Sequence, residues 1–568
     1  MKFQRFASIG IVTALLFGST LAHAADAPSY DESYRGKAPA TYGNIGINTA
    51  SSEQLFMFTS NFISLVGDQS HTESITVCTS LATPGCQVFD RQQARADLVP
   101  CSSTIQSDCL IGLVVRDAQG KEVSSTPISG GVASTSQLFT GDPTVGLPAG
   151  GSPTLYSVPA ATHSGGDTYL VKADLVVSRE KGQSKFQLGK FEAAIFPVKK
   201  VAGTGTPTGA ATDVKDYQNI SVTAGGGNNN CDQNFFDGKD CYVRQAFPAG
   251  FTFELKVRLS QSVSGWLHGR MKGPVITVTD NPAVKEGIDL SIVAEPIRVP
   301  TVFAYIPVSS APANILSRFQ GFPRYGTLDC PNSYTYTNCR SEAKLEAINL
   351  RHEHIDASDE AIVEIREWLN VLSDKATVEP SQWSVQTMSG SSGGDIGKCT
   401  SDVKALGGVV TTNATMYSPG PPSFNKSTST LDYKVVAPHF THSGEVFLGT
   451  YNLAINSKVA RCLYGFSNAP ISATISISSA DGTNRVATTT VTERNGFLNL
   501  AAYGFEFSDP TISVKITGEK ITEAAPTPAA SPISVAQAQK STITCIKGKT
   551  SKKVTAVKPK CPAGYKKK

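Results

Sequence analysis

The twelve cysteines are the feature that most constrains what this chain can fold into. Eight of them form four neighbouring pairs, with partners eight to ten residues apart: Cys78 and Cys86, Cys101 and Cys109, Cys231 and Cys241, Cys330 and Cys339. An even number of cysteines at short spacings indicates a disulfide framework rather than metal or redox chemistry. No Cys-x-x-Cys motif occurs, so the sequence gives little support to a zinc ribbon or a thioredoxin-like site.

The cysteine spacing leaves one pairing open. The first four cysteines also allow a nested arrangement, Cys78 with Cys109 and Cys86 with Cys101, and sequence alone does not choose between the two. The remaining four cysteines lie far from their neighbours, and we predict the links Cys399 to Cys462 and Cys545 to Cys561.

The N-terminus predicts export. Lys2 and Arg5 precede an apolar run from Ala7 to Leu21, which ends in the small-residue pattern Ala22-His23-Ala24. This order is typical of a signal peptide, cut here before Ala25. No later segment reaches the roughly 20 apolar residues of a membrane helix, so we predict no transmembrane span. The expected location is extracellular, at the cell surface.

Alternating apolar and polar residues predict strands along most of the chain. Phe251, Phe253, Leu255, Val257 and Leu259 alternate with polar residues, and residues 168–177 and 186–197 read as a hairpin. Asp481-Gly482 and Asn495-Gly496 are strong hairpin turns between the later strands. The predicted fold class is mainly β, with two or three antiparallel β-sandwich (Ig-like) domains and a small disulfide-clasped basic C-terminal hairpin.

One helix is predicted among the strands, over residues 358–375. Ile362, Ile365, Leu369 and Leu372 recur at helical spacing, and acids precede them where the helix dipole favours negative charge. We expect it to pack across the surrounding sheet, with a partner-binding helix as the alternative.

Composition shifts set the predicted domain boundaries. A Gly/Thr-rich run near residue 202 and a Pro/Ala-rich run near residue 523 are typical of linkers. The predicted parts are a signal peptide (1–24), an N-terminal β-domain (25–201), a linker (202–213), a central β-domain (214–398), a C-terminal β-sandwich (399–522), a second linker (523–541) and a basic tail module (542–568).

The search for catalytic or metal chemistry finds only weak motifs. Gly390 to Gly394 satisfies G-x-S-x-G around Ser392, but the residues after it show no helical period, as a nucleophile elbow requires. The histidine pairs His352/His354 and His439/His442 have metal-compatible spacing but no nearby acidic cluster. The Asp232 to Asp240 segment lacks the ligand order of an EF-hand. We expect no cofactor and no catalytic residue.

The aromatic residues give two candidate ligand contacts. Tyr334 and Tyr336 lie in a polar loop between Cys330 and Cys339, where they could stack on a sugar or contact a protein. Trp266 lies in a strand-like context and is expected in the core.

The tail differs in charge from the rest of the chain. Residues 540–568 hold ten lysines and no acid, whereas the body is mildly acidic. A dense positive surface attracts polyanions, so we expect envelope binding through the lysines of the tail module. These are Lys547, Lys549, Lys552, Lys553, Lys558, Lys560, Lys566, Lys567 and Lys568. The alternative is a solubilising or export-related basic tail with no partner.

The tail, Thr542 to Lys549 followed by Lys552 to Lys568 with its Cys-Pro-Ala-Gly-Tyr-Lys-Lys-Lys ending, resembles a C-terminal module of exported actinobacterial proteins of uncharacterised function. The segments Arg461 to Phe466 and Leu500 to Phe505 resemble the β-rich domain that accompanies it. The resemblance covers about the last 150 residues, and residues 250–300 more weakly. It implies location and architecture, and it assigns no catalytic residue.

Together these features predict a non-enzymatic surface protein for adhesion, ligand capture or a structural envelope layer. Its expected partners are anionic envelope polymers or lipid head groups, with glycans or a surface protein as further candidates. Nucleic acid is not expected, because the protein is predicted to be exported and the tail has a single aromatic residue, Tyr565. The alternative is an extracellular hydrolase acting on polysaccharide or peptide.

Overall fold

The structure is a computed structural model. It describes residues 39–49, 60–67, 72–129, 138–202, 235–236, 240–281, 287–319, 345, 349–354, 358–388, 394–403, 405–467, 472–478, 484–486, 488–507, 511–519 and 540–568. The chain divides into two compact units. The large unit comprises residues 1–464 and 468–518, and the second comprises residues 465–467 and 519–568. We describe each by itself.

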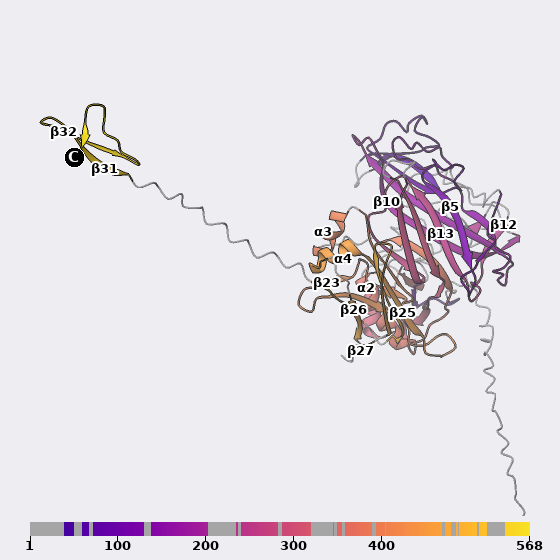
Figure 1. The fold of residues 1–568 in the computed structure, drawn as a ribbon. Helices are drawn as coiled ribbons and strands as arrows, with labels where there is room; N and C mark the ends of the chain where they lie inside the picture. The colour runs from indigo at the N-terminus through magenta and orange to yellow at the C-terminus, as the bar shows by residue number, and fades with distance from the viewer. Residues whose placement is uncertain are drawn as a thin grey trace, which may run out of the picture. The chain divides into compact units, whose positions relative to one another are not determined.

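The large unit is mainly β (Figure 1). Most of its described strands belong to one sheet. The described strands follow one path across this sheet: β28 Thr488–Arg494, β29 Phe497–Glu506, β25 Leu448–Asn456, β21 Leu406–Thr412, β14 Gly265–Arg270, β20 Ser381–Thr387, β10 Gln187–Ala202, β9 Thr168–Glu180, β4 Arg91–Asp97, β2 Asn61–Gly67 and β3 Thr72–Val77. Five short strands pair beside it: β7 Thr126–Ile128, β8 Thr154–Ser157, β11 Phe235–Phe236, β12 Asp240–Arg244 and β17 Ile297–Arg298. All three β segments predicted from the sequence thus contribute strands to one sheet.

Three smaller sheets complete the large unit. One contains β15 Lys272–Asp280, β16 Ile288–Glu295, β13 Thr252–Leu259, β5 Cys109–Arg116 and β6 Glu122–Val123. Another contains β22 Met416–Tyr417, β23 Ser423–Asn425, β24 Thr430–Val436, β30 Thr511–Thr517, β26 Ser472–Ser478 and β27 Asn484–Val486. The third contains β18 Phe303–Pro307, β1 Asn44–Asn48 and β19 Asn349–Glu353.

The main hydrophobic core joins the largest sheet to the β5/β13/β16 sheet. Phe253, Leu255 and Val257 of β13 belong to the same buried cluster as Phe191 of β10 and Val171 of β9. The alternation predicted for β13 is therefore confirmed, because every second residue faces this core. The predicted hairpin is also confirmed, since β9 and β10 pair antiparallel.

Among the described strands, two pairs are parallel, which the prediction of antiparallel sheets did not include. β14 pairs parallel with β21, and β1 pairs parallel with β19. The partners lie far apart in sequence, and parallel partners need a long crossover rather than a tight turn. No local turn signal marks such pairs, so periodicity alone does not reveal them.

The described residues contain four α-helices, whereas the sequence predicted one. The predicted helix is α2, Asp359–Val371, and its apolar face packs in a buried cluster with β1 and β19. It ends before Lys375 because Ser373 and Asp374 adopt left-handed φ angles of 55° and 54°. The other three helices are α1 Ala313–Phe319, α3 Gly394–Val403 and α4 Ser457–Tyr464; a 3₁₀ turn spans Val308–Ser310. They are too short for a clear helical period, and such helices depend on tertiary packing.

Four disulfides lie among the described residues. The structure selects the local pairing of the first four cysteines, Cys78–Cys86 and Cys101–Cys109. The predicted bridge Cys399–Cys462 is present and joins α3 to α4, which pack together near β23 at one end of the large unit (Figure 1). Cys231, Cys330 and Cys339 lie outside the described residues, so the links predicted for them stay predictions.

Candidate functional site

The tail module is a small sheet braced by one disulfide. Its strands are β32 Thr550–Ala556, β31 Ser541–Lys547 and β33 Lys566–Lys567, in that order. The bridge Cys545–Cys561 ties the central strand to the segment that follows the hairpin. The predicted clasped hairpin is therefore present, and a third short strand extends it.

Every one of the nine lysines predicted to bind the envelope is exposed in this module. No acidic residue occurs between residues 540 and 568 to neutralise them. The exposed lysines therefore give this segment a positively charged surface. We call residues 540–568 the basic module.

The basic module has almost no hydrophobic core. Among residues 540–568, all of which the structure describes, Cys545 is the only buried residue. Ile543, Ile546 and Val554 are half-buried. A hairpin of this size is marginal in water without a staple, so the disulfide is its main source of order.

The large unit offers a groove of about 700 Å³. It lies between the starts of α2 and α3, the 418–426 segment and β24, and its lining mixes three aspartates with two lysines. Lys426 pairs with Asp395 at 2.7 Å, and Lys434 lies 3.9 Å from Asp359. Its charges are thus close to balanced, which suits a neutral polar ligand better than a polyanion.

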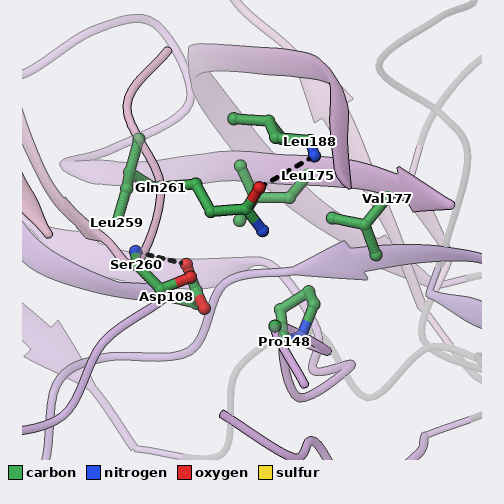
Figure 2. A pocket seen from close by; sticks show the side chains of 9 residues that line it. Asp108, Pro148, Leu175, Val177, Leu188, Leu259, Ser260 and Gln261 are labelled. Atoms are coloured by element: carbon green, nitrogen blue, oxygen red, sulfur yellow. Dashed lines mark hydrogen bonds between the residues drawn. The ribbon is translucent and has the colours of Figure 1, made fainter. Parts of the chain in front are cut away.

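A second hollow, shown in Figure 2, is closed by its own hydrogen bonds. Asp108 accepts a hydrogen bond from the Ser260 amide at 2.9 Å, and Gln261 accepts one from the Leu188 amide at 3.1 Å. Burial raises the pKa of Asp108, and the Ser260 bond offsets part of that rise. The hollow leaves no room for a water molecule, so Asp108 acts in the structure as a loop anchor.

The structure brings an acid between the first pair of histidines. His352 Nδ1 lies 2.9 Å and His354 Nε2 lies 3.3 Å from the two carboxylate oxygens of Glu364 on α2. Burial alone would raise the pKa of Glu364, but the hydrogen bonds from both histidines outweigh it and hold that pKa far below its usual range. The sequence shows no acidic cluster near these histidines, and the structure adds a single acid from α2. The signal that could have revealed it is an acid within the buried stripe of that helix.

The second histidine pair is separated into two different environments. His442 contacts the buried carboxylate of Glu379 through Nδ1, at 2.6 Å. His439 Nδ1 lies 3.1 Å from the Phe507 carbonyl. No group of three or more His, Cys, Asp or Glu side chains among the described residues is arranged to hold a metal ion.

A buried ionic network crosses β4, β9 and β10, and sequence reasoning missed it. Lys172 contacts Asp97 and Asp174, while Arg95 contacts Asp174 and Glu192, each at 2.8 Å. The side chains of Lys172 and of all three acids are fully buried. Burial raises the pKa of Asp97 to about 6, against the opposing effect of Lys172. These residues alternate with core residues and resemble an ordinary solvated strand face in the sequence.

The remaining predicted sites have mixed outcomes. Trp266 is buried, as expected for a core residue. Tyr334, Tyr336 and Ser392 lie outside the described residues, as does most of the Asp232 to Asp240 segment. The prediction that no helix follows the G-x-S-x-G motif was wrong, because α3 begins at the last glycine of the motif. β20 precedes the motif.

In the part of the chain that the structure describes, no helix combines the length and the apolar character needed to cross a membrane. The chain matches no protein-family model and no curated protein.

Proposed function

We propose that this chain is an exported, non-enzymatic cell-surface protein whose basic module binds anionic polymers or lipid head groups of the cell envelope. The observation that carries the proposal is the exposure of nine lysines on a disulfide-braced module without a single acid. Such a surface attracts polyanions through long-range electrostatics. The large unit then serves adhesion, ligand capture or a structural layer at the surface.

Three further observations support parts of this proposal. The groove beside α2 and α3 is large enough for a small ligand, which favours capture of a neutral polar ligand such as a glycan. The two mostly antiparallel sheets that share the main core support a sandwich arrangement, and we propose Ig-like domains on that basis. The four described disulfides favour an extracellular, cell-surface location. We also propose the actinobacterial origin that the resemblance of the tail implies. The extracellular hydrolase stays the alternative, since Ser392 lies outside the described residues.

The test compares envelope retention of the mature protein with that of a version ending at Gln539, at rising salt. We expect the complete tail to increase retention at low ionic strength, and this gain to disappear as salt screens exposed charges beyond about 10 Å at 0.1 M. A full-length variant with all nine lysines replaced by Gln should behave like the shortened chain. Equal retention of all three proteins would refute envelope binding by the basic module.

A further inference from the structure

The strand register of the basic module divides its lysines between two opposite faces. Lys552 on β32 and Lys567 on β33 both lie opposite Cys545, so all three side chains point to the same face. We call this the disulfide face. Lys547, two residues after Cys545 on β31, belongs to it as well.

The other face also carries lysines. Lys553 lies opposite Thr544, and Lys566 lies opposite Ile546, one residue out of step with Cys545 on β31. The side chains of Thr542 and Thr555, which are hydrogen-bonded at 2.7 Å, lie on this same side. We call it the threonine face.

The disulfide face is partly covered, whereas most side chains of the threonine face are exposed. Cys561 and the turn around Gly564 pack over the disulfide face, where a Cβ at Gly564 would lie 3.2 Å from Lys547 Nζ. Lys552 and Lys567 remain exposed at the flanks of this cover. Both faces therefore present exposed charge, although their shapes differ.

This division distinguishes between the two anionic partners of the proposed function. A flat membrane surface contacts one face of a small sheet and leaves the lysines of the other face in solvent. A flexible polymer has no such limit, because a chain can pass along both faces and around the edge. Charge on both faces is used fully only by a partner of the second kind.

We infer that the basic module binds a flexible polyanion that contacts both faces, rather than a planar lipid surface. This inference rests on the proposed function and specifies its ligand as a polymer of repeated phosphate or carboxylate groups. Each anionic group pairs with exposed lysines, and the binding releases counterions, so affinity falls steeply with salt.

The test uses the full-length protein and two matched double variants. Lys552→Gln with Lys567→Gln neutralises the disulfide face, and Lys553→Gln with Lys566→Gln neutralises the threonine face. Lys398→Gln with Lys458→Gln removes the same charge from exposed positions of the large unit and serves as the control. Peptide mapping of the Cys545–Cys561 link in each protein verifies that the module is intact.

The probes are long-chain inorganic polyphosphate, poly-glutamate, and vesicles of equimolar phosphatidylcholine and phosphatidylglycerol. We expect each face variant to weaken binding to at least one polymer by about tenfold or more, and the control to leave it unchanged. The two polymers distinguish a phosphate from a carboxylate ligand.

Loss of binding in only one face variant would overturn the inference, as would binding to vesicles that equals or exceeds binding to both polymers. In either case the proposed function would survive, with a planar anionic surface as the partner. If the wild-type protein binds neither polymer nor vesicle, the proposed function itself fails.

Discussion

The large unit and the basic module solve the same problem, stabilising β-strands, by different means. In the large unit two sheets enclose a continuous cluster of buried side chains, among them Phe62, Leu255 and Trp383. In the basic module only Cys545 is buried, and a covalent bond takes the place of a core. The surfaces differ accordingly, because nearly every side chain of the module is free to carry charge.

The difference shows where each region can place charged groups. The large unit buries enough apolar area to tolerate an ionic network inside it, since hydrophobic burial offsets the desolvation of charges. The basic module buries almost no apolar area, so its lysines stay in solvent. The buried charges of the large unit are therefore structural, while the lysines of the module are all exposed to solvent.

The largest expected effect comes from removing a cation inside the large unit. Lys172→Met leaves the buried carboxylates of Asp97 and Asp174 without their shared partner, and we expect a loss of about 3–5 kcal/mol in the free energy of unfolding. Denaturant unfolding followed by tryptophan fluorescence measures this, because all three tryptophans lie outside the basic module.

Lys190→Met is the matched control for this prediction. Lys190 contacts Glu192 in the same network, but its side chain is 27% exposed, so water compensates for part of the loss. We expect a smaller destabilisation. Equal stability of the Lys172 variant and the wild type would contradict a role for the network in stability.

A second variant tests whether the disulfide stabilises the basic module in place of a hydrophobic core. Replacing both Cys545 and Cys561 by Ser opens a loop with a sequence separation of 16, which costs about 3 kcal/mol on the chain-entropy model. Because the module has little other stabilisation, we expect it to unfold, seen as loss of amide-exchange protection in β31 and β32. Tryptophan-detected unfolding of the large unit should not change.

Opening a disulfide in the large unit tests whether a core makes such a bridge dispensable. Replacing Cys78 and Cys86 by Ala, at a separation of 8, costs about 2.5 kcal/mol on the same model. The loss is similar in size, yet the large unit should stay folded because its core remains. A basic module that keeps full exchange protection without its disulfide would refute this contrast.

The smallest expected effect, taken per pH unit, is a pH dependence that belongs to the large unit alone. Because the pKa of Asp97 is raised to about 6 by burial, the folded state holds its proton more tightly than the unfolded state does. This contribution stabilises fully below the unfolded pKa near 4 and is lost as pH rises to about 6. The slope is at most about 1.4 kcal/mol per pH unit.

Asp97→Asn removes this titration. Between pH 4 and 6, we expect the wild-type free energy of unfolding to fall relative to that of the variant, as measured by denaturant unfolding at each pH. Parallel pH profiles for the two proteins would contradict the raised pKa of Asp97.

Local patterns in the sequence were sufficient to predict many strands and turns. The hairpin of β28 and β29 forms at Asn495-Gly496, where both residues adopt the left-handed φ angles that such a turn requires. The alternation of β13 was likewise predicted from residues that are close together along the chain.

The sequence predicted some properties of the basic module and left others undetermined. The lysines of the basic module, their exposure and the link between Cys545 and Cys561 follow from one short segment, and the sequence predicted all of them. Their distribution over two faces was not predicted, because it depends on the register of β31 against β32 and β33. A shift of one residue in that register would move each side chain to the other face.

The sequence by itself determined that the chain is mainly β, where several strands and one long helix lie, and that the tail is basic and disulfide-linked. These properties depend on periodicity, turn chemistry and charge, all of which act over a few residues. Only the tertiary structure decided which strands share a sheet, that β14 and β21 run parallel, and that Glu364 joins His352 and His354. Those contacts join residues distant in sequence, and their energies arise from burial and charge pairing that exist only after folding.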